Sequence, residues 1–83
     1  MIRLTKHAQE AIGVRDIAID WIETAVSTPD WIEPDPRRPD RTRSYKAIKA
    51  IEEYGARVLR VVHRPEGDDI VIITVHFDRG GRR

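Results

Sequence analysis

The clearest hydrophobic pattern lies in the last third of the chain, where β-branched residues alternate with polar ones. Residues 56–64 and 70–77 are rich in valine and isoleucine, which favour extended strands. The five residues between them, PEGDD, are typical of a turn. The pattern therefore predicts a hairpin. In its second strand, one face would carry Val71, Ile73, Val75 and Phe77, and the other Ile70, Ile72, Thr74 and His76.

The first third has the spacing of helices. Residues 6–14 are helical in composition, and Thr5 is suited to cap them because its hydroxyl can accept a hydrogen bond from a backbone N–H. In residues 17–26 apolar side chains recur at steps of three and four, which is typical of a helix with one buried face. The segment STPD at residues 27–30 ends this helix. A short strand, residues 2–4, precedes both helices.

The middle of the chain contains a proline-rich loop. Residues 31–33 can form an edge strand, and three prolines within residues 34–39 then exclude both helix and central strand. The loop leads into residues 41–50, which we interpret as a strand, although the composition of residues 46–53 would also permit a helical turn. A turn is predicted at residues 52–55.

Helices followed by strands predict an α+β fold, with two N-terminal helices packed on one face of a three- to four-stranded antiparallel sheet. The opposite face should be open and carry the basic residues. The 83 residues are enough for one small domain, which we place at residues 1–79. Residues 80–83 are expected to form a disordered tail.

Composition narrows the chemistry. The chain has no cysteine, which excludes disulfides, thiolate metal sites and cysteine nucleophiles. Its N-terminal residues contain no long apolar run, so we expect no signal peptide, no membrane span and a cytoplasmic location. The three histidines have no regular ligand spacing, and no glycine-rich phosphate loop is present. The sequence therefore predicts no metal and no cofactor.

Charge is segregated along the chain, although the net charge is only +1. Residues 10–35 contain seven acids and one base, whereas residues 36–64 contain nine bases and three acids. Within residues 37–49, six cationic side chains accompany a single acid, Asp40. Such a segment can hold a polyanion. It can equally be a solvated basic face that pairs with the acidic one.

Several of these segments resemble one family. They are the opening LTKHAQE at residues 4–10, the linker IEPDPRRPDRTR at 32–43, the strand YKAI at 45–48 and the hairpin RVLRVVHRPEGDDIVIITVHFDR at 57–79. Together they are similar to the bacterial DUF4258 proteins, which look like small relatives of the RelE/ParE toxins and of the wider barnase–RelE class of ribonuclease-like folds. The resemblance covers about residues 2–79. It implies a RelE/ParE-like α+β fold and a toxin or ribonuclease role.

The resemblance also implies functional positions. The family's histidine in the first helix falls on His7, and its basic and aromatic strand motif falls on Arg43, Tyr45 and Lys46. The family's terminal aromatic-Asp-Arg motif falls on residues 77–79.

Three positions depart from the family pattern. The arginine expected four residues after the histidine is Ala11, and the aromatic residue expected before the terminal motif is His76. The glycine expected after the first helix is Asp16, which can still adopt the left-handed conformation of such a turn. The missing arginine favours loss of the ancestral chemistry.

RNA cleavage by transesterification needs a base for the 2′-hydroxyl proton, a cation for the phosphorane and an acid for the leaving 5′-oxygen. The catalytic candidates are His7, Arg43, Tyr45, Lys46 and His76. His7 is the leading acid or base, and Arg43 and Lys46 are the phosphate ligands. Each also has a structural interpretation: a local cap for His7, a charged strand face for the two cations, and packing for Tyr45 and His76. The ribonuclease hypothesis requires His7 and the strand's cations to share one uncovered side.

Two functions from different classes follow. The first is a toxin-like RNA-binding protein that cleaves RNA without metal and is covered by a small antitoxin. The alternative is a non-catalytic module of the same fold that binds protein or nucleic acid. In both, the RNA-binding candidates are Arg37, Arg38, Arg41, Arg60 and Arg79.

Overall fold

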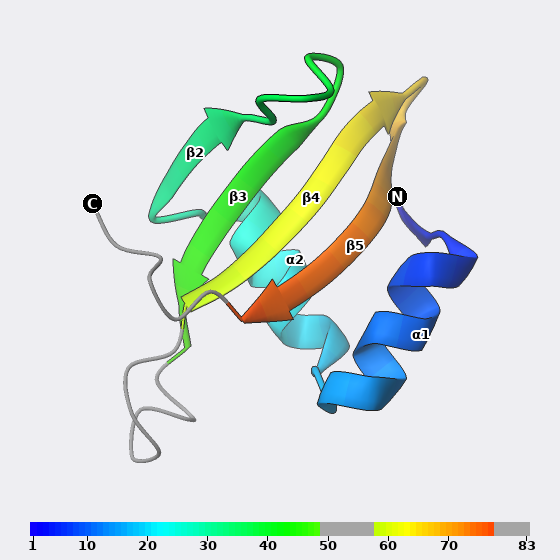
Figure 1. Cartoon of the computed structure of the whole chain (residues 1–83), viewed down its shortest axis with the longest axis vertical. Helices are drawn as coiled ribbons and strands as arrows, with labels where there is room; N and C mark the ends of the chain where they lie inside the picture. Colours follow the sequence, from blue (N-terminus) through cyan, green and yellow to red (C-terminus); the bar gives the residue numbers. More distant parts are fainter. Residues whose placement is uncertain (49–57, 78–83) are drawn as a thin grey trace.

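The computed structural model describes residues 1–48 and 58–77 of the chain (Figure 1). In chain order the elements are β1 (Ile2–Leu4), α1 (Lys6–Arg15), α2 (Ile19–Ser27), β2 (Trp31–Pro34), β3 (Thr42–Ala47), β4 (Val58–Glu66) and β5 (Asp69–Phe77). Lys49, the turn predicted at residues 52–55, Arg79 and the tail predicted at residues 80–83 lie outside the described residues.

The five strands form one mixed sheet in the order β1-β5-β4-β3-β2. The contacts from β2 through β3 and β4 to β5 are antiparallel, but β1 runs parallel to β5, with Ile2 opposite Ile70. The prediction of a three- to four-stranded antiparallel sheet is therefore wrong. The short first strand joins the sheet because its apolar residues, Ile2 and Leu4, pack against the core beside β5.

The two ends of α1 show how local sequence fixes the helix. Thr5 is the N-cap, and its hydroxyl accepts a hydrogen bond from the amide of Ala8 at 3.1 Å. The same hydroxyl donates to the carbonyl oxygen of Ile73 on β5 at 3.0 Å. At the other end Asp16 is left-handed, with φ 53° and ψ 50°, which confirms the conformation expected where the family has glycine.

One irregularity in β5 changes which residues face the core. Thr74 and Ile72 pair with successive residues of β4, so the intervening Ile73 is an extra residue, a β-bulge. Ile72 and Val75 are consequently both buried in the same cluster. Strict alternation placed these two residues on opposite faces, and the bulge is the reason that this prediction is wrong.

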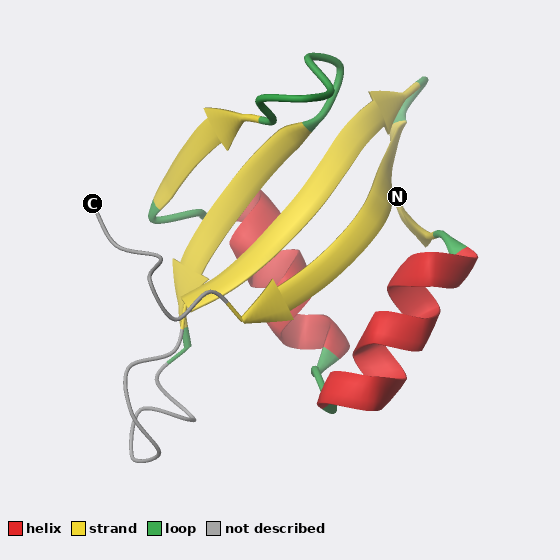
Figure 2. Cartoon of the chain, viewed as in Figure 1, coloured by secondary structure: helices red, strands yellow, loops and turns green. Residues whose placement is uncertain are grey.

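The helices and the strands, red and yellow in Figure 2, share one hydrophobic core. α1 packs against β5 and β1, and α2 packs against β4 and β3. The buried cluster consists of Ala8, Ala11, Ile17, Ile22, Ala25, Ile48, Leu59, Val61, Ile72 and Val75. Because both helices contribute to this one cluster, they cover the same face of the sheet, which is called the helix face below.

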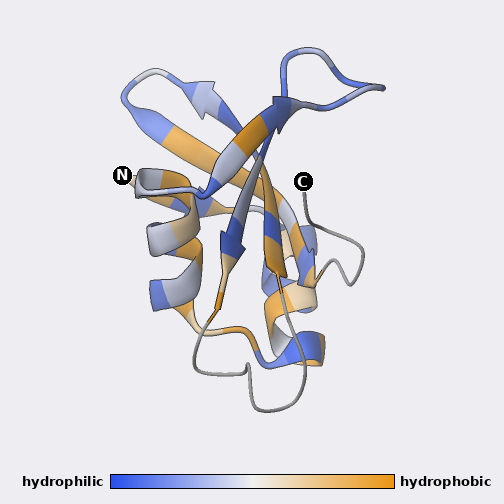
Figure 3. Cartoon of the chain, turned by 90° about the vertical axis from the view of Figure 1, so that its left-hand side faces the viewer, coloured by the Kyte–Doolittle hydropathy of each residue, from blue (hydrophilic) through white to orange (hydrophobic). Residues whose placement is uncertain are grey.

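Polar residues concentrate away from this core. In Figure 3 the loop that follows β2 is hydrophilic along most of its length, whereas hydrophobic segments line the strands and helices. This loop, residues 35–41, joins β2 to β3 beside the face without helices. Within residues 1–48 and 58–77, no helix is long and apolar enough to cross a membrane.

Candidate functional site

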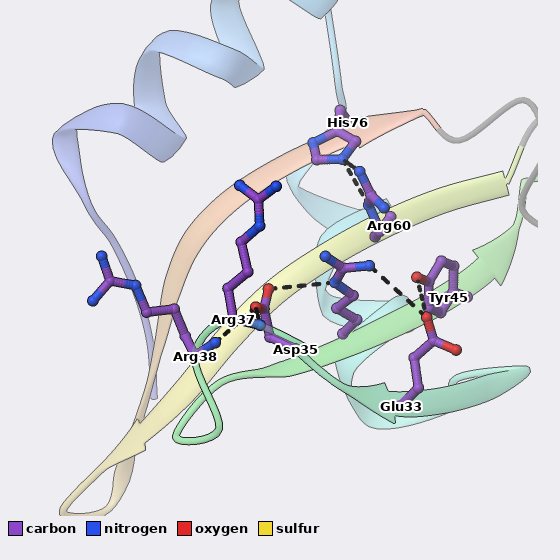
Figure 4. A network of polar contacts seen from close by, with 8 residues as sticks. Glu33, Asp35, Arg37, Arg38, Tyr45, Arg60 and His76 are labelled. Carbon is purple, nitrogen blue, oxygen red and sulfur yellow. Dashed lines mark hydrogen bonds and ion pairs between the residues drawn. The ribbon is translucent and has the colours of Figure 1, made fainter.

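Residues from four neighbouring strands form a row across the sheet. Trp31 on β2 pairs with Tyr45 on β3, and Tyr45 pairs with Arg60 on β4. Arg60 in turn pairs with His76 on β5. Directly paired residues point to the same face, and Leu59, next to Arg60, points into the core. The row therefore lies on the face opposite the helices, called the open face below. Figure 4 shows three of its members, Tyr45, Arg60 and His76.

The aromatic end of the row is a fixed stack. The rings of Trp31 and Tyr45 have centroids 4.8 Å apart and planes inclined by 9°. Tyr45 is only 3% exposed, and its hydroxyl donates to a carboxylate oxygen of Glu33 at 2.7 Å. Burial, followed by the hydrogen bond to Glu33, raises the pKa of Tyr45. Tyr45 therefore keeps its proton at neutral pH and supports Trp31.

The other end of the row is a hydrogen-bonded pair of side chains, Arg60 and His76. Arg60 donates to Nε2 of His76 from Nε and from a terminal nitrogen. A guanidinium has no acceptor, so Nε2 of His76 must carry the lone pair.

Asp35 organises the arginine-rich loop. Its Oδ1 accepts hydrogen bonds from the backbone amides of Arg37 at 2.9 Å and Arg38 at 3.0 Å. Its Oδ2 accepts from Nε of Arg43 on β3 at 3.3 Å. The amide of Arg37 is the main cause of the lowered pKa of Asp35, and Arg38 and Arg43 lower it further. Asp35 is therefore ionised at neutral pH and fastens the loop to the sheet.

The loop and the row border a hollow of about 540 Å³ on the open face. Its lining includes one acid, Asp35, and the imidazole of His76. Nε of Arg41 is buried and has no hydrogen-bond partner among the described residues. Figure 4 shows the side chain of Arg37 extending over the sheet. The arginines that line the hollow are Arg37, Arg38, Arg41, Arg43 and Arg60.

His7 does not reach the hollow. It is exposed on α1, and α1 packs against β5 and β1 on the helix face. Its neighbour Ala8 is the residue that enters the core. The expectation that His7 and the cations of the third strand share one uncovered side is therefore wrong.

Lys46 also lies on the helix face, because it pairs with the buried residue Leu59. Its Nζ donates to the carbonyl oxygen of Thr28 at 2.9 Å and lies 3.4 Å from a carboxylate oxygen of Asp30. These contacts tie β3 to the segment after α2. Since strand residues alternate between faces, Lys46 and its neighbour Tyr45 cannot act on the same ligand from one side of the sheet.

The structure brings together three of the five predicted catalytic residues, Arg43, Tyr45 and His76, and four of the predicted RNA-binding arginines. Arg79 lies outside the described residues.

Sequence reasoning missed Trp31 and Asp35. An aspartate in a proline-rich loop is a signal for a side-chain turn, because its carboxylate can accept the backbone amide two residues on. The Trp31 stack depends on strand register. Within the described ranges, no three side chains that bind metals come together.

A buried serine and histidine form a second polar pair, on the helix face. Ser44 is 1% exposed, and its Oγ lies 2.7 Å from Nε2 of His63. Burial lowers the pKa of His63. A substrate cannot reach so deeply buried a hydroxyl, so this pair stabilises the sheet rather than forming a nucleophilic site.

A family model described as a domain of unknown function (DUF4258) matches residues 4–77. The match includes the whole row and the arginine-rich loop. No curated protein and no solved structure matches the chain. The description of the family names no activity, so a function has to rest on the geometry of the hollow.

Proposed function

The chain belongs to the DUF4258 family, and we propose that this member binds RNA through the arginine-lined hollow of its open face. The observation that carries the proposal is the convergence of five guanidinium groups and one carboxylate on a single hollow. Guanidinium groups bind pairs of phosphate oxygens, and clustered positive charge attracts a polyanion.

The bonding state of the arginines supports the proposal. The guanidinium of Arg43 is paired with Asp35, whereas the described residues offer no ion pair to the side chains of Arg37 and Arg38. Both are exposed. The buried Nε of Arg41 lacks a partner within the described residues, and a phosphate oxygen would satisfy it.

RNA binding is tested by fluorescence anisotropy with a labelled oligonucleotide. The Arg37→Gln, Arg38→Gln double variant should weaken binding at least about tenfold, because two charge-assisted contacts are lost. Arg15→Gln, in the last turn of α1, is the matched control and should bind like the wild type. Absence of binding, or equal binding by the double variant, would contradict the proposal.

A second candidate function is metal-independent cleavage of the bound RNA, favoured by the position of His76. Nε2 of His76 carries a lone pair beside Arg60 and borders the hollow. A phosphate that engages Arg60 would release this nitrogen to accept the 2′-hydroxyl proton. The 2′-oxygen then bonds to phosphorus, and the 5′-oxygen leaves with a proton from solvent. The arginines would stabilise the phosphorane.

Cleavage is tested in the presence of a chelator with two histidine variants. The geometry predicts that His76→Ala loses at least about a hundredfold in rate, the usual contribution of a general base. His7→Ala should keep the activity. The reverse result would support the assignment of His7 from the family motif and contradict that of His76. RNA binding without cleavage by any form would indicate a non-catalytic binding module.

We also propose that the chain acts as a toxin of the RelE/ParE type, because its motifs are similar to those of such toxins. The support for this proposal is that resemblance together with the arginine hollow, and not the sheet, which is mixed. A toxin in the bacterial cytoplasm would be neutralised by a small antitoxin whose disordered segment covers the hollow. Expression of the chain alone should then arrest growth of a bacterial host, and the His76→Ala form should not.

A further inference from the structure

The row on the open face joins an aromatic platform to the arginine hollow. Trp31 stacks on Tyr45, and the hydroxyl of Tyr45 is held by Glu33. Trp31 itself is partly exposed on β2, which is the edge strand of the sheet. The stack is thus buried at its Tyr45 side and in contact with solvent at its Trp31 side. A ring fixed in this way loses little conformational freedom when a ligand packs against it.

The platform lies within reach of the phosphate-binding groups. Trp31 and Arg60 are separated by one strand, and two strand spacings amount to roughly 10 Å. Both residues belong to the same cross-strand row. A base on Trp31 and a phosphate at Arg60 would therefore belong to the same nucleotide or to adjacent ones.

We infer that the RNA is bound as a single strand, with one unpaired base stacked on Trp31 and its phosphates in the arginine hollow. This inference rests on the proposed function and adds its substrate class. A base in a duplex is already stacked on its neighbours and cannot offer its face to a protein ring, whereas single strands can splay a base onto an aromatic side chain. Guanidinium groups beside an aromatic platform are suited to such a strand.

The experiment uses the full chain with Trp21→Phe, so that Trp31 is the only tryptophan. A short single-stranded RNA should quench the emission of Trp31, and a duplex of the same sequence should not. By anisotropy the single strand should bind roughly tenfold more tightly than the duplex, since stacking of one base is lost in the duplex. Trp31→Leu should remove most of this difference, and Trp31→Phe should keep it.

Ile32→Ala is the matched control. Ile32 follows Trp31 on β2, is 56% exposed and points to the opposite face by alternation, so its replacement should leave binding unchanged. Equal affinity for single strand and duplex, or unquenched Trp31 emission on binding, would overturn the stacking inference and leave RNA binding intact. Absence of binding to either RNA would overturn both. If Trp31→Leu does not fold, the quenching experiment and Trp31→Phe still decide between these outcomes.

Discussion

Among single residues, His63 has the clearest physical consequence. Its imidazole lies at the edge of the core, where it satisfies the buried hydroxyl of Ser44 at 2.7 Å. A buried hydroxyl without a partner costs free energy, so the pair is stabilising. Burial disfavours the charged ring and lowers the pKa of His63. The burial of His63 therefore links folding to pH.

Stability should decrease as the pH falls below the ordinary histidine value of 6.5. In the unfolded chain His63 takes up a proton near that pH, whereas the lowered pKa in the folded chain delays protonation. Between the pKa of the folded chain and that of the unfolded chain, the unfolded chain binds the proton more readily, so stability falls as the pH decreases. The stability that the neutral ring contributes is complete only above the pKa of the unfolded chain. The free energy of unfolding in urea, measured between about pH 7.5 and about pH 5.5, should fall over this interval.

Two histidine variants identify the source of this decrease. His63→Gln should flatten the pH dependence in the interval, while His7→Gln should leave it unchanged because His7 is exposed on α1. An unchanged slope in His63→Gln would show that another group is responsible.

For single residues, the sequence predicts local conformations better than contacts with residues far away in the chain. Thr5 and Asp16 have the expected conformations because capping depends on adjacent residues alone. The neighbours of His63 and Trp31 depend on strand register, which joins distant parts of the chain. Their roles could not be derived from local spacing.

Among the elements, the loop of residues 35–41 is held by a small number of bonds that meet at Asp35. That carboxylate accepts two backbone amides from the loop and one guanidinium nitrogen from β3. A backbone–backbone hydrogen bond, from the amide of Asp35 to the carbonyl oxygen of Arg41 at 3.0 Å, closes the loop. Such side-chain turns preorganise a backbone that would otherwise sample many conformations.

Asp35→Ala should loosen this loop. Hydrogen exchange of the Arg37 and Arg38 amides, followed by NMR, should accelerate at least about tenfold, because both amides lose their acceptor. Asp40→Ala is the control, since Asp40 is exposed in the same loop and makes no hydrogen bond or ion pair with the described residues. Unchanged exchange in Asp35→Ala would mean that the loop is ordered by other contacts.

The elements also show why the sheet was harder to predict than the helices. The helical periodicity and the hairpin are local signals, and both elements formed near their expected positions. The direction of β1 relative to β5 is set by packing across 68 positions of the chain, since Ile2 lies opposite Ile70. The bulge at Ile73 has no local signal such as glycine, and it is accompanied by a hydrogen bond from Thr5.

Across the whole molecule, the pairing of the acidic segment with the basic one is confirmed in part. Asp30 lies against Lys46, and Asp35 lies against Arg43, so two acids of the first half neutralise two bases of the second. The remaining cations of the loop have no such acid among the described residues. Cations that lack an acidic partner within the described residues are therefore gathered at the hollow of the open face.

This distribution predicts how binding should depend on salt. Each phosphate neutralised on a single strand contributes about −0.7 to the slope of log K against log salt. With Arg43 already paired to Asp35, the hollow offers Arg37, Arg38 and Arg41, so the slope should be roughly −2. Arg37→Gln should reduce its magnitude by about 0.7, whereas Arg15→Gln should not change it. A slope near zero would mean that the RNA is held without its phosphates, and the arginine hollow could not then be the binding site.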